Sequence, residues 1–175
     1  MPLPIAALQG VRICGVAAGG LHPLAVSTAG SLYSFGHGGF GALGHGDRAA
    51  QHIPRLVEAL HGIRVLAVEA GIGHSLALSE AGEVYSFGSG ASGELGHGEM
   101  AGQLQLMPRM IAGLPGVRLR SIAAGLATSF AVTADGVVYG WGCGRAGGHQ
   151  GAVLGMGLSG DQFVPRMYPG LLLLP

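Results

Sequence analysis

The sequence predicts an all-β fold made of three repeated units, and three observations support this prediction. Residues 16–47 align with residues 68–99 without a gap, and 19 of the 32 aligned pairs are identical. Residues 68–90 align in turn with residues 122–144, with 9 of 23 pairs identical. Within each unit, short apolar runs alternate with glycine-containing turns, which is typical of strands joined by hairpins. Residues 36–46 hold six glycines, which disfavour the rival interpretation, a helical solenoid.

The units also share one motif at their start and another near their end. Each opens with a similar five-residue motif: Leu8-Gln-Gly-Val-Arg12, Leu60-His-Gly-Ile-Arg64 and Leu114-Pro-Gly-Val-Arg118. Each closes on a proline followed by an arginine: Pro54-Arg55, Pro108-Arg109 and Pro165-Arg166. We therefore predict one repeat domain over residues 8–170, made of units 8–59, 60–113 and 114–170. Residues 1–7 and 171–175 are then terminal extensions.

Each unit is predicted to hold about four strands, and the first unit shows why. A first strand includes the Val-Ala-Ala-Gly segment at residues 16–19, and a second covers the apolar run 24–26. A turn at residues 28–30 leads to a third strand at residues 32–35, and a fourth follows at residues 53–57. The consecutive apolar residues of the second strand indicate that both of its faces are covered. Helix is plausible only near residues 56–60.

Glycine recurs at the same place in every hairpin turn. Gly30, Gly82 and Gly136 follow Thr28-Ala29, Glu80-Ala81 and Ala134-Asp135. A tight hairpin turn requires a positive φ, which glycine adopts without steric cost. We therefore predict that these three residues are structural turn glycines. In the strand after the first turn, Tyr33 and Phe35 lie two residues apart and must point to one face.

Four strands at a period of about 50 residues are typical of propeller blades, so the units are predicted to form an open arc of three four-stranded antiparallel blades. In a closed ring each blade is covered on both sides. The two end faces of an arc should therefore expose apolar residues. The apolar run at residues 169–175, which departs from the repeat, strengthens this expectation. We expect further blades, self-association or a protein partner to cover these faces.

Composition excludes several classes of function. Nine arginines balance nine acidic residues and lysine is absent, so no basic patch indicates nucleic-acid binding. With 49% hydrophobic and 10% charged residues, intrinsic disorder is disfavoured. No apolar run reaches the roughly 20 residues of a membrane-spanning helix. Cys14 and Cys143 form neither a disulfide framework nor a metal-binding CxxC pair. We expect a cytoplasmic or nuclear protein without a cofactor or metal.

The motifs of the second unit resemble a known repeat. They read Val68-Glu-Ala-Gly71-x-x-His74-Ser75-Leu-Ala-Leu, Gly82-x-Val-Tyr85-Ser-Phe-Gly88 and Gly93-Glu-Leu-Gly96-His97-Gly98. This pattern resembles the repeat of the regulator of chromosome condensation family, over residues 8–170. The resemblance implies a propeller that is normally closed by about seven blades, of which this chain holds three. It also implies a protein-binding role.

The Gly-x-x-His turns are the first candidate site. In the family's founding member, residues of this turn help to engage the small GTPase Ran and to loosen its nucleotide, and an acidic residue precedes one of the histidines. Here the residues before the histidine positions are Leu21, Gly73 and Ala127, and the histidine positions hold His22, His74 and Thr128. These six residues are the candidate partner-binding residues. The structural alternative is that the histidines bond to neighbouring backbone and hold the blades together.

Other chemistry has little support. His45 and His97 lie in the Leu-Gly-His-Gly motifs of the first two units, one in each, which favours structural use over a metal site. Nucleophile and phosphate-loop motifs are absent. The plant ultraviolet-B receptor of this family absorbs light through clustered tryptophans. This chain has one tryptophan, Trp141, which argues against that role unless other blades supply the cluster.

We therefore predict a non-enzymatic protein-interaction module, part of a larger propeller scaffold. The alternatives are guanine-nucleotide exchange on a Ran-like small GTPase and a substrate-recruiting segment of a ubiquitin ligase.

Overall fold

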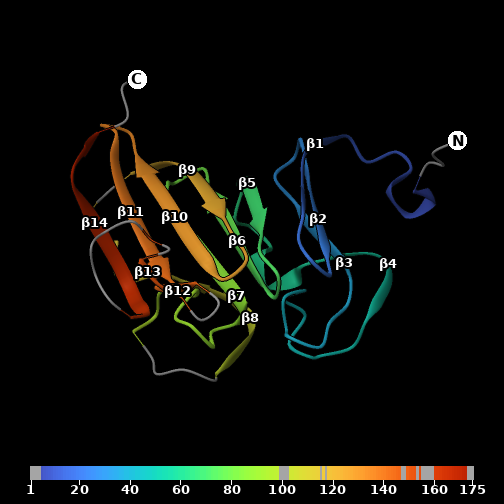
Figure 1. The fold of residues 1–175 in the computed structure, drawn as a ribbon. Helices are drawn as coiled ribbons and strands as arrows, with labels where there is room; N and C mark the ends of the chain where they lie inside the picture. The colour runs from blue at the N-terminus through green and yellow to red at the C-terminus, as the bar shows by residue number, and fades with distance from the viewer. Residues whose placement is uncertain are drawn as a thin grey trace, which may run out of the picture.

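The structure is a computed structural model that describes residues 5–98, 103–114, 116, 118–146, 149–152, 154 and 160–172. It contains three four-stranded antiparallel sheets that lie one after another in chain order (Figure 1). Short 3₁₀ turns are the only helical segments of the described residues. The predicted all-β arc of three blades is thus confirmed. Among these residues, no helix has the length and apolar character needed to cross a membrane.

The first blade follows a short 3₁₀ turn, η1 (Ala6–Leu8). Its strands are paired in chain order, β1-β2-β3-β4, so each connection is to the adjacent strand. The central pair aligns Ala25 with Tyr33 and Val26 with Leu32. The four strands of this blade are β1 (Ile13–Ala18), β2 (Pro23–Ser27), β3 (Leu32–Gly36) and β4 (Gln51–Leu56).

The second blade repeats this plan and the third extends it. A 3₁₀ turn, η2 (Glu58–Leu60), leads into the second blade. It lies within residues 56–60, where the sequence made helix plausible. The second blade contains β5 (Val65–Ala70), β6 (His74–Ser79), β7 (Val84–Ser89) and β8 (Leu104–Met110). The third contains β9 (Leu119–Ala124), β10 (Thr128–Thr133), β11 (Val137–Gly142) and β14 (Gln162–Leu172).

Between β11 and β14 lies an additional hairpin of β12 (Arg145–Ala146) and β13 (His149–Ala152). The repeat pattern did not predict this hairpin, because it falls where the third unit no longer aligns with the other two. β14 also runs to Leu172, two residues past the predicted end of the third unit. Residues 1–4 and 173–175 of the predicted terminal extensions lie outside the described residues.

The hydrophobic core lies between the blades. The first strands of successive blades are neighbours, with β1 in contact with β5 and β5 with β9. One cluster joins Leu24, Val26 and Leu32 of the first blade to Val68, Ala77 and Phe87 of the second. The next cluster repeats these positions one blade later: Leu76, Leu78 and Val84 meet Ile122, Ala131 and Trp141. The second blade therefore packs one face against the first blade and the other face against the third.

The hairpin turns lie against the next blade. Gly30, Gly82 and Gly136 have φ values of +86°, +83° and +89°, the conformation that the turns require. At Gly82 a Cβ atom would also lie 2.7 Å from the Cγ of Arg118. The opening arginine of a blade thus packs where the preceding turn has no side chain.

Candidate protein-interaction surface

The Gly-x-x-His turns connect the first and second strands of each blade, and neighbouring turns are bonded to one another. The Gly20 N–H donates to the Gly71 carbonyl at 3.1 Å, and the Ile72 N–H donates to the Leu126 carbonyl at 3.0 Å. Backbone bonds thus join the first turn to the second and the second to the third. The three turns form one continuous edge of the arc.

The histidines of these turns bond to serines of the following blade. His22 Nε2 lies 2.7 Å from Ser75 Oγ, and His74 Nε2 lies 3.1 Å from Ser129 Oγ. Both histidines are buried, with exposed fractions of 2% and 0%. These two contacts, called here the histidine–serine pairs, tie each blade to the next beneath the edge formed by the turns.

The serine hydroxyls fix the protonation of the imidazoles. Ser75 Oγ donates its hydrogen to the Ala42 carbonyl at 2.8 Å, and Ser129 Oγ donates to the Glu94 carbonyl at 2.7 Å. Each hydroxyl oxygen must therefore accept from the histidine, which places the proton on Nε2. The Nδ1 atoms of His22 and His74 are buried without a partner.

Burial also holds these rings neutral. Desolvation lowers the pKa of His22 to about 4. Desolvation, and then the neighbouring His22, lowers the pKa of His74 to about 4. A second proton would be carried by Nδ1, and no acceptor lies near that atom. Charging either ring would therefore leave an unpaired N–H donor inside the blade interface.

The exposed part of the edge is apolar. Leu21, Ile72 and Leu126, one from each turn, have exposed fractions of 46%, 49% and 75%. Phe40 is 40% exposed, and its ring lies 3.2 Å from where a Cβ of Gly73 would be. Ile72 in turn packs on Gly20: a Cβ atom at Gly20 would lie 2.9 Å from Cγ1 of Ile72. We call Leu21, Phe40, Ile72 and Leu126 the turn surface.

The six predicted partner-binding residues divide between this surface and the interior. Leu21 is exposed and Ala127 is half-buried. Gly73 and Thr128 are buried, as are both histidines. The side chains of His22 and His74 contact serine hydroxyls of the next blade, whereas the structural alternative expected backbone partners. The edge therefore presents apolar side chains, with its histidines below the surface.

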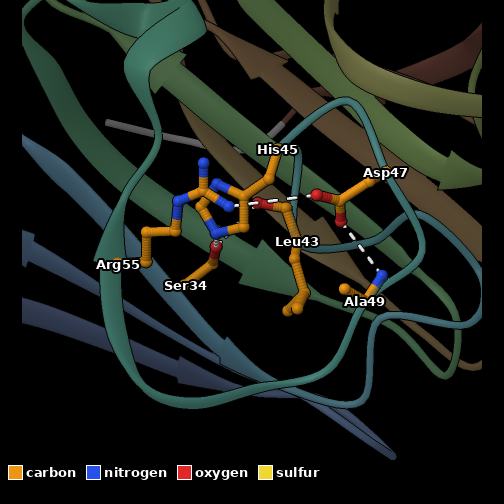
Figure 2. Close-up of polar contacts among 6 residues, drawn as sticks. All are labelled: Ser34, Leu43, His45, Asp47, Ala49 and Arg55. Carbon is orange, nitrogen blue, oxygen red and sulfur yellow. Dashed lines mark hydrogen bonds and ion pairs between the residues drawn. The ribbon is translucent and has the colours of Figure 1, made fainter.

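The second histidine of the first two repeats acts within its own blade. His45 Nε2 lies 3.0 Å from Ser34 Oγ, which donates to the Leu43 carbonyl at 2.6 Å (Figure 2). Burial, and then the nearby Arg55, lowers the pKa of His45. The same loop is closed by an ion pair between Arg55 and Asp47 at 3.9 Å, and Asp47 also accepts from the Ala49 N–H. His97 repeats this contact with Ser86 at 3.0 Å.

These glycine-rich loops also support the next blade. A Cβ at Gly44 would lie 3.0 Å from the Phe87 ring, and a Cβ at Gly96 would lie 2.9 Å from Nε1 of Trp141. Trp141 is fully buried and donates to the Glu94 carbonyl at 2.9 Å. Among the described residues, no group of three or more histidine, cysteine or acidic side chains is placed to hold a metal ion.

The repeat motifs alone did not point to the serine partners or to most of the turn surface. A signal for the serines is present, because Ser75 and Ser129 occupy the same repeat position immediately after His74 and Thr128. No comparable signal marks Phe40, which reaches the second turn only through the path of its loop. Ile72 and Leu126 occupy one repeat position, but their exposure depends on the packing of the turns.

Comparison with known proteins identifies the repeat. The family model described as the regulator of chromosome condensation (RCC1) repeat matches residues 29–78 and 81–132. A second model of the same repeat matches residues 65–94 and 119–147. Together these matches cover parts of all three blades.

Two curated relatives are longer than this chain. The chain is 41% identical over 166 residues to the ultraviolet-B receptor UVR8 of Arabidopsis thaliana, an alignment that covers 94% of this chain and 36% of the receptor. It is also 41% identical over 145 residues to the human E3 ubiquitin-protein ligase HERC2, covering 82% of this chain and 3% of the ligase. The chain thus spans about a third or less of the length of these relatives.

Two solved structures share the fold. Human WBSCR16 superposes with a TM-score of 0.77 at 25% identity, covering 91% of this chain and 38% of that one. Prp20p of Saccharomyces cerevisiae superposes with a TM-score of 0.76 at 26% identity, covering 90% of this chain and 38% of that one. Prp20p binds Gsp1p and histones.

Proposed function

The chain belongs to the RCC1 repeat family, and we propose that it is a non-enzymatic protein-interaction module that binds its partner through the turn surface. The observation that carries this proposal is the row of exposed apolar side chains on the connected turns. Leu21, Ile72 and Leu126 come from three different blades, yet the backbone bonds between the turns hold them along one edge.

The frame beneath this surface supports a binding role. The histidine–serine pairs and the hydrogen bonds between turns fix the three blades relative to one another. A surface that is ordered before binding loses little conformational entropy when a partner docks. Apolar side chains that stay in water in the free chain gain from being covered, so they favour association.

The chemistry of the turn surface indicates the kind of partner. Its four members are aliphatic or aromatic, and none carries a charge. A protein segment with complementary apolar side chains would fit it, and that contact should depend little on salt concentration because it does not rest on ion pairs.

The test is a comparison of capture by the immobilised chain and by variants. The variants Ile72→Glu and Leu126→Glu place a charge on the turn surface, at side chains that are 49% and 75% exposed. Met167→Glu is the matched control, because Met167 is 57% exposed on β14, outside the turn surface. Proteins captured by the wild type and the control but lost with both turn variants are the expected partners, and each is then titrated in purified form. Identical capture by all four chains would contradict the proposal.

A second candidate function is binding of a small GTPase. The fold likeness to Prp20p supports this candidate, because Prp20p binds Gsp1p. Calorimetric titration of a Ran-type GTPase into the chain, with Leu126→Glu as the comparison, tests this candidate. Binding that the substitution abolishes would make the GTPase a ligand of the turn surface.

A further inference from the structure

The junctions between blades carry a repeated arginine at the end opposite the turn surface. In each blade the Gly-x-x-His turn precedes the second strand and the hairpin turn follows it, so the two kinds of turn lie at opposite ends of the blade. A Cβ at Gly30 would lie 2.5 Å from Cγ of Arg64, and a Cβ at Gly82 would lie 2.7 Å from Cγ of Arg118. The two arginines therefore occupy the same place at the two junctions, each over the hairpin turn of the preceding blade.

At the first junction, the arginine is paired within the chain. Nη2 of Arg64 donates to the Thr28 carbonyl at 3.2 Å, and its Nε lies 3.3 Å from Oε1 of Glu80. Glu80 belongs to the hairpin turn of the second blade, and its N–H donates to the Arg64 carbonyl at 2.8 Å. The chain thus supplies its own carboxylate to this arginine.

At the second junction, this carboxylate is missing. Ala134 takes the place of Glu80, since its N–H donates to the Arg118 carbonyl at 3.0 Å. The next residue, Asp135, accepts a hydrogen bond from the Thr133 hydroxyl. Within the part of the chain that the structure describes, no acidic side chain forms an ion pair with Arg118, and Arg118 is exposed. Its guanidinium donors are therefore available to a ligand.

A groove of about 490 Å³ lies beside Arg118. The corresponding groove beside Arg64 measures about 240 Å³, so the space is larger where the arginine is unpaired. Met110, Leu114 and Leu119 line the larger groove, and Met110 is 47% exposed. An apolar group that enters this groove covers Met110 and is itself removed from water, which favours binding.

Among the described residues that line the groove, Glu83 is the only charged one besides Arg118. Its carboxylate accepts from the Tyr85 hydroxyl at 2.9 Å and makes no ion pair with Arg118. The groove thus combines apolar walls with an unpaired cation. An arginine presents several N–H donors in one plane, which match the two oxygens of a carboxylate.

We propose that this groove binds an acidic side chain of a partner protein. The carboxylate pairs with Arg118 as that of Glu80 pairs with Arg64, and the apolar neighbours of the acidic residue cover Met110 and Leu114. The partner segment is therefore both acidic and apolar. The proposal does not depend on the turn surface, because the two sites lie at opposite ends of the blades.

The experiment is a titration of the isotope-labelled chain with the peptide acetyl-Leu-Glu-Leu-amide, followed by nuclear magnetic resonance. The peptide shifts the amide signals of Gly82, Met110 and Arg118. Arg118→Gln weakens binding about fivefold, the upper end of what one exposed ion pair supplies. Arg120→Gln is the matched control and binds like the wild type, because Arg120 is exposed on β9 and does not line the groove.

A further variant occupies the site from within the chain. Ala134→Glu places a carboxylate beside Arg118, as Glu80 does beside Arg64, and so blocks the peptide. Higher salt concentration weakens binding to the wild type, because it screens the exposed ion pair. The spectrum of each variant without peptide shows whether it is folded.

Four outcomes overturn the proposal. They are no shift of the groove signals at millimolar peptide, equal binding by Arg118→Gln and Arg120→Gln, unchanged binding by a folded Ala134→Glu, and equally tight binding of a peptide with glutamine in place of glutamate. The last outcome would identify the groove as a site for neutral apolar segments.

Discussion

At the scale of single residues, the histidines of the turns are buried, neutral and bonded to the next blade. Their position resembles a binding motif in sequence, but their side chains contact Ser75 and Ser129 rather than solvent. The pKa of each ring is lowered to about 4, so both rings are neutral near neutral pH. Their contribution to the interface therefore depends on pH.

We predict that the free energy of unfolding falls as pH drops from about 6.5 to 4. The unfolded chain takes up a proton on each histidine near the ordinary pKa of 6.5, whereas the folded chain resists protonation until about pH 4. This difference removes roughly 3 kcal/mol per histidine by pH 4, with no further loss below it. Urea denaturation at a series of pH values measures the effect.

The control for this prediction separates the histidines from the carboxylates. In a variant with both His22→Gln and His74→Gln, the slope of stability between pH 6.5 and pH 4 flattens, whereas in His52→Gln it does not, because His52 is exposed. Burial raises the pKa of Glu94, which acts in the opposite direction and is common to all these chains. An unchanged slope in the double variant would show that the two histidines are not the source.

Removal of one serine hydroxyl should weaken the interface between two blades. Ser75→Ala leaves the buried Nε2–H of His22 and the Ala42 carbonyl without their partner. We expect a loss of about 2 kcal/mol in the free energy of unfolding, typical for an unsatisfied buried donor. Ser121→Ala is the control, because Ser121 is exposed on β9. Equal stability of the two variants in urea denaturation would argue against the histidine–serine pair.

At the scale of elements, the hairpin turns connect strands within a blade and also contact the following blade. Gly30 and Gly82 have positive φ values, and a Cβ atom at either position would collide with Arg64 or Arg118 of the next blade. Each turn glycine therefore meets two requirements at once, a backbone conformation and a close approach.

Two glycine variants separate these requirements. Gly62 has a φ of +84° and no atom within 4 Å of its Cβ position, whereas a Cβ at Gly82 would lie 2.7 Å from Arg118. Gly62→Val should lose about 1–2 kcal/mol from backbone strain alone. Gly82→Val should lose roughly 1–3 kcal/mol more, because the side chain also collides with the next blade. Thermal unfolding of both variants measures the difference, and equal losses would contradict the close contact.

At the scale of the whole molecule, the chain is an arc whose core lies between blades. Equivalent residues of successive blades form the two internal interfaces. This arrangement explains why Val68 is 6% exposed and Val16, at the same repeat position of the first blade, is 75% exposed.

We predict that the purified chain does not accelerate nucleotide release from a Ran-type GTPase. The residues before the histidine positions are Leu21, Gly73 and Ala127, none of which is acidic, and the alignment covers 38% of Prp20p. Release of a fluorescent nucleotide, measured with and without excess chain, provides the test, and Prp20p serves as the comparison protein. A clear acceleration would favour guanine-nucleotide exchange over the non-enzymatic module.

The sequence by itself determined the repeat and the local geometry within each unit. Regular spacing identified three units, and the glycines at 30, 82 and 136 located the hairpin turns, because a tight turn restricts φ at one position. Alternation placed Tyr33 and Phe35 on one face of a strand. These features depend on residues close together in the chain, and a repeated pattern makes them visible.

Only the tertiary structure decided which residues are exposed and which are buried between blades. His22 and Ser75 are 53 residues apart, so their contact depends on how one blade packs against the next. The same packing buries Val68 and leaves Val16 exposed, although the two residues are identical and occupy one repeat position. Burial is a property of the neighbours that surround a side chain, and the repeat pattern alone does not specify those neighbours.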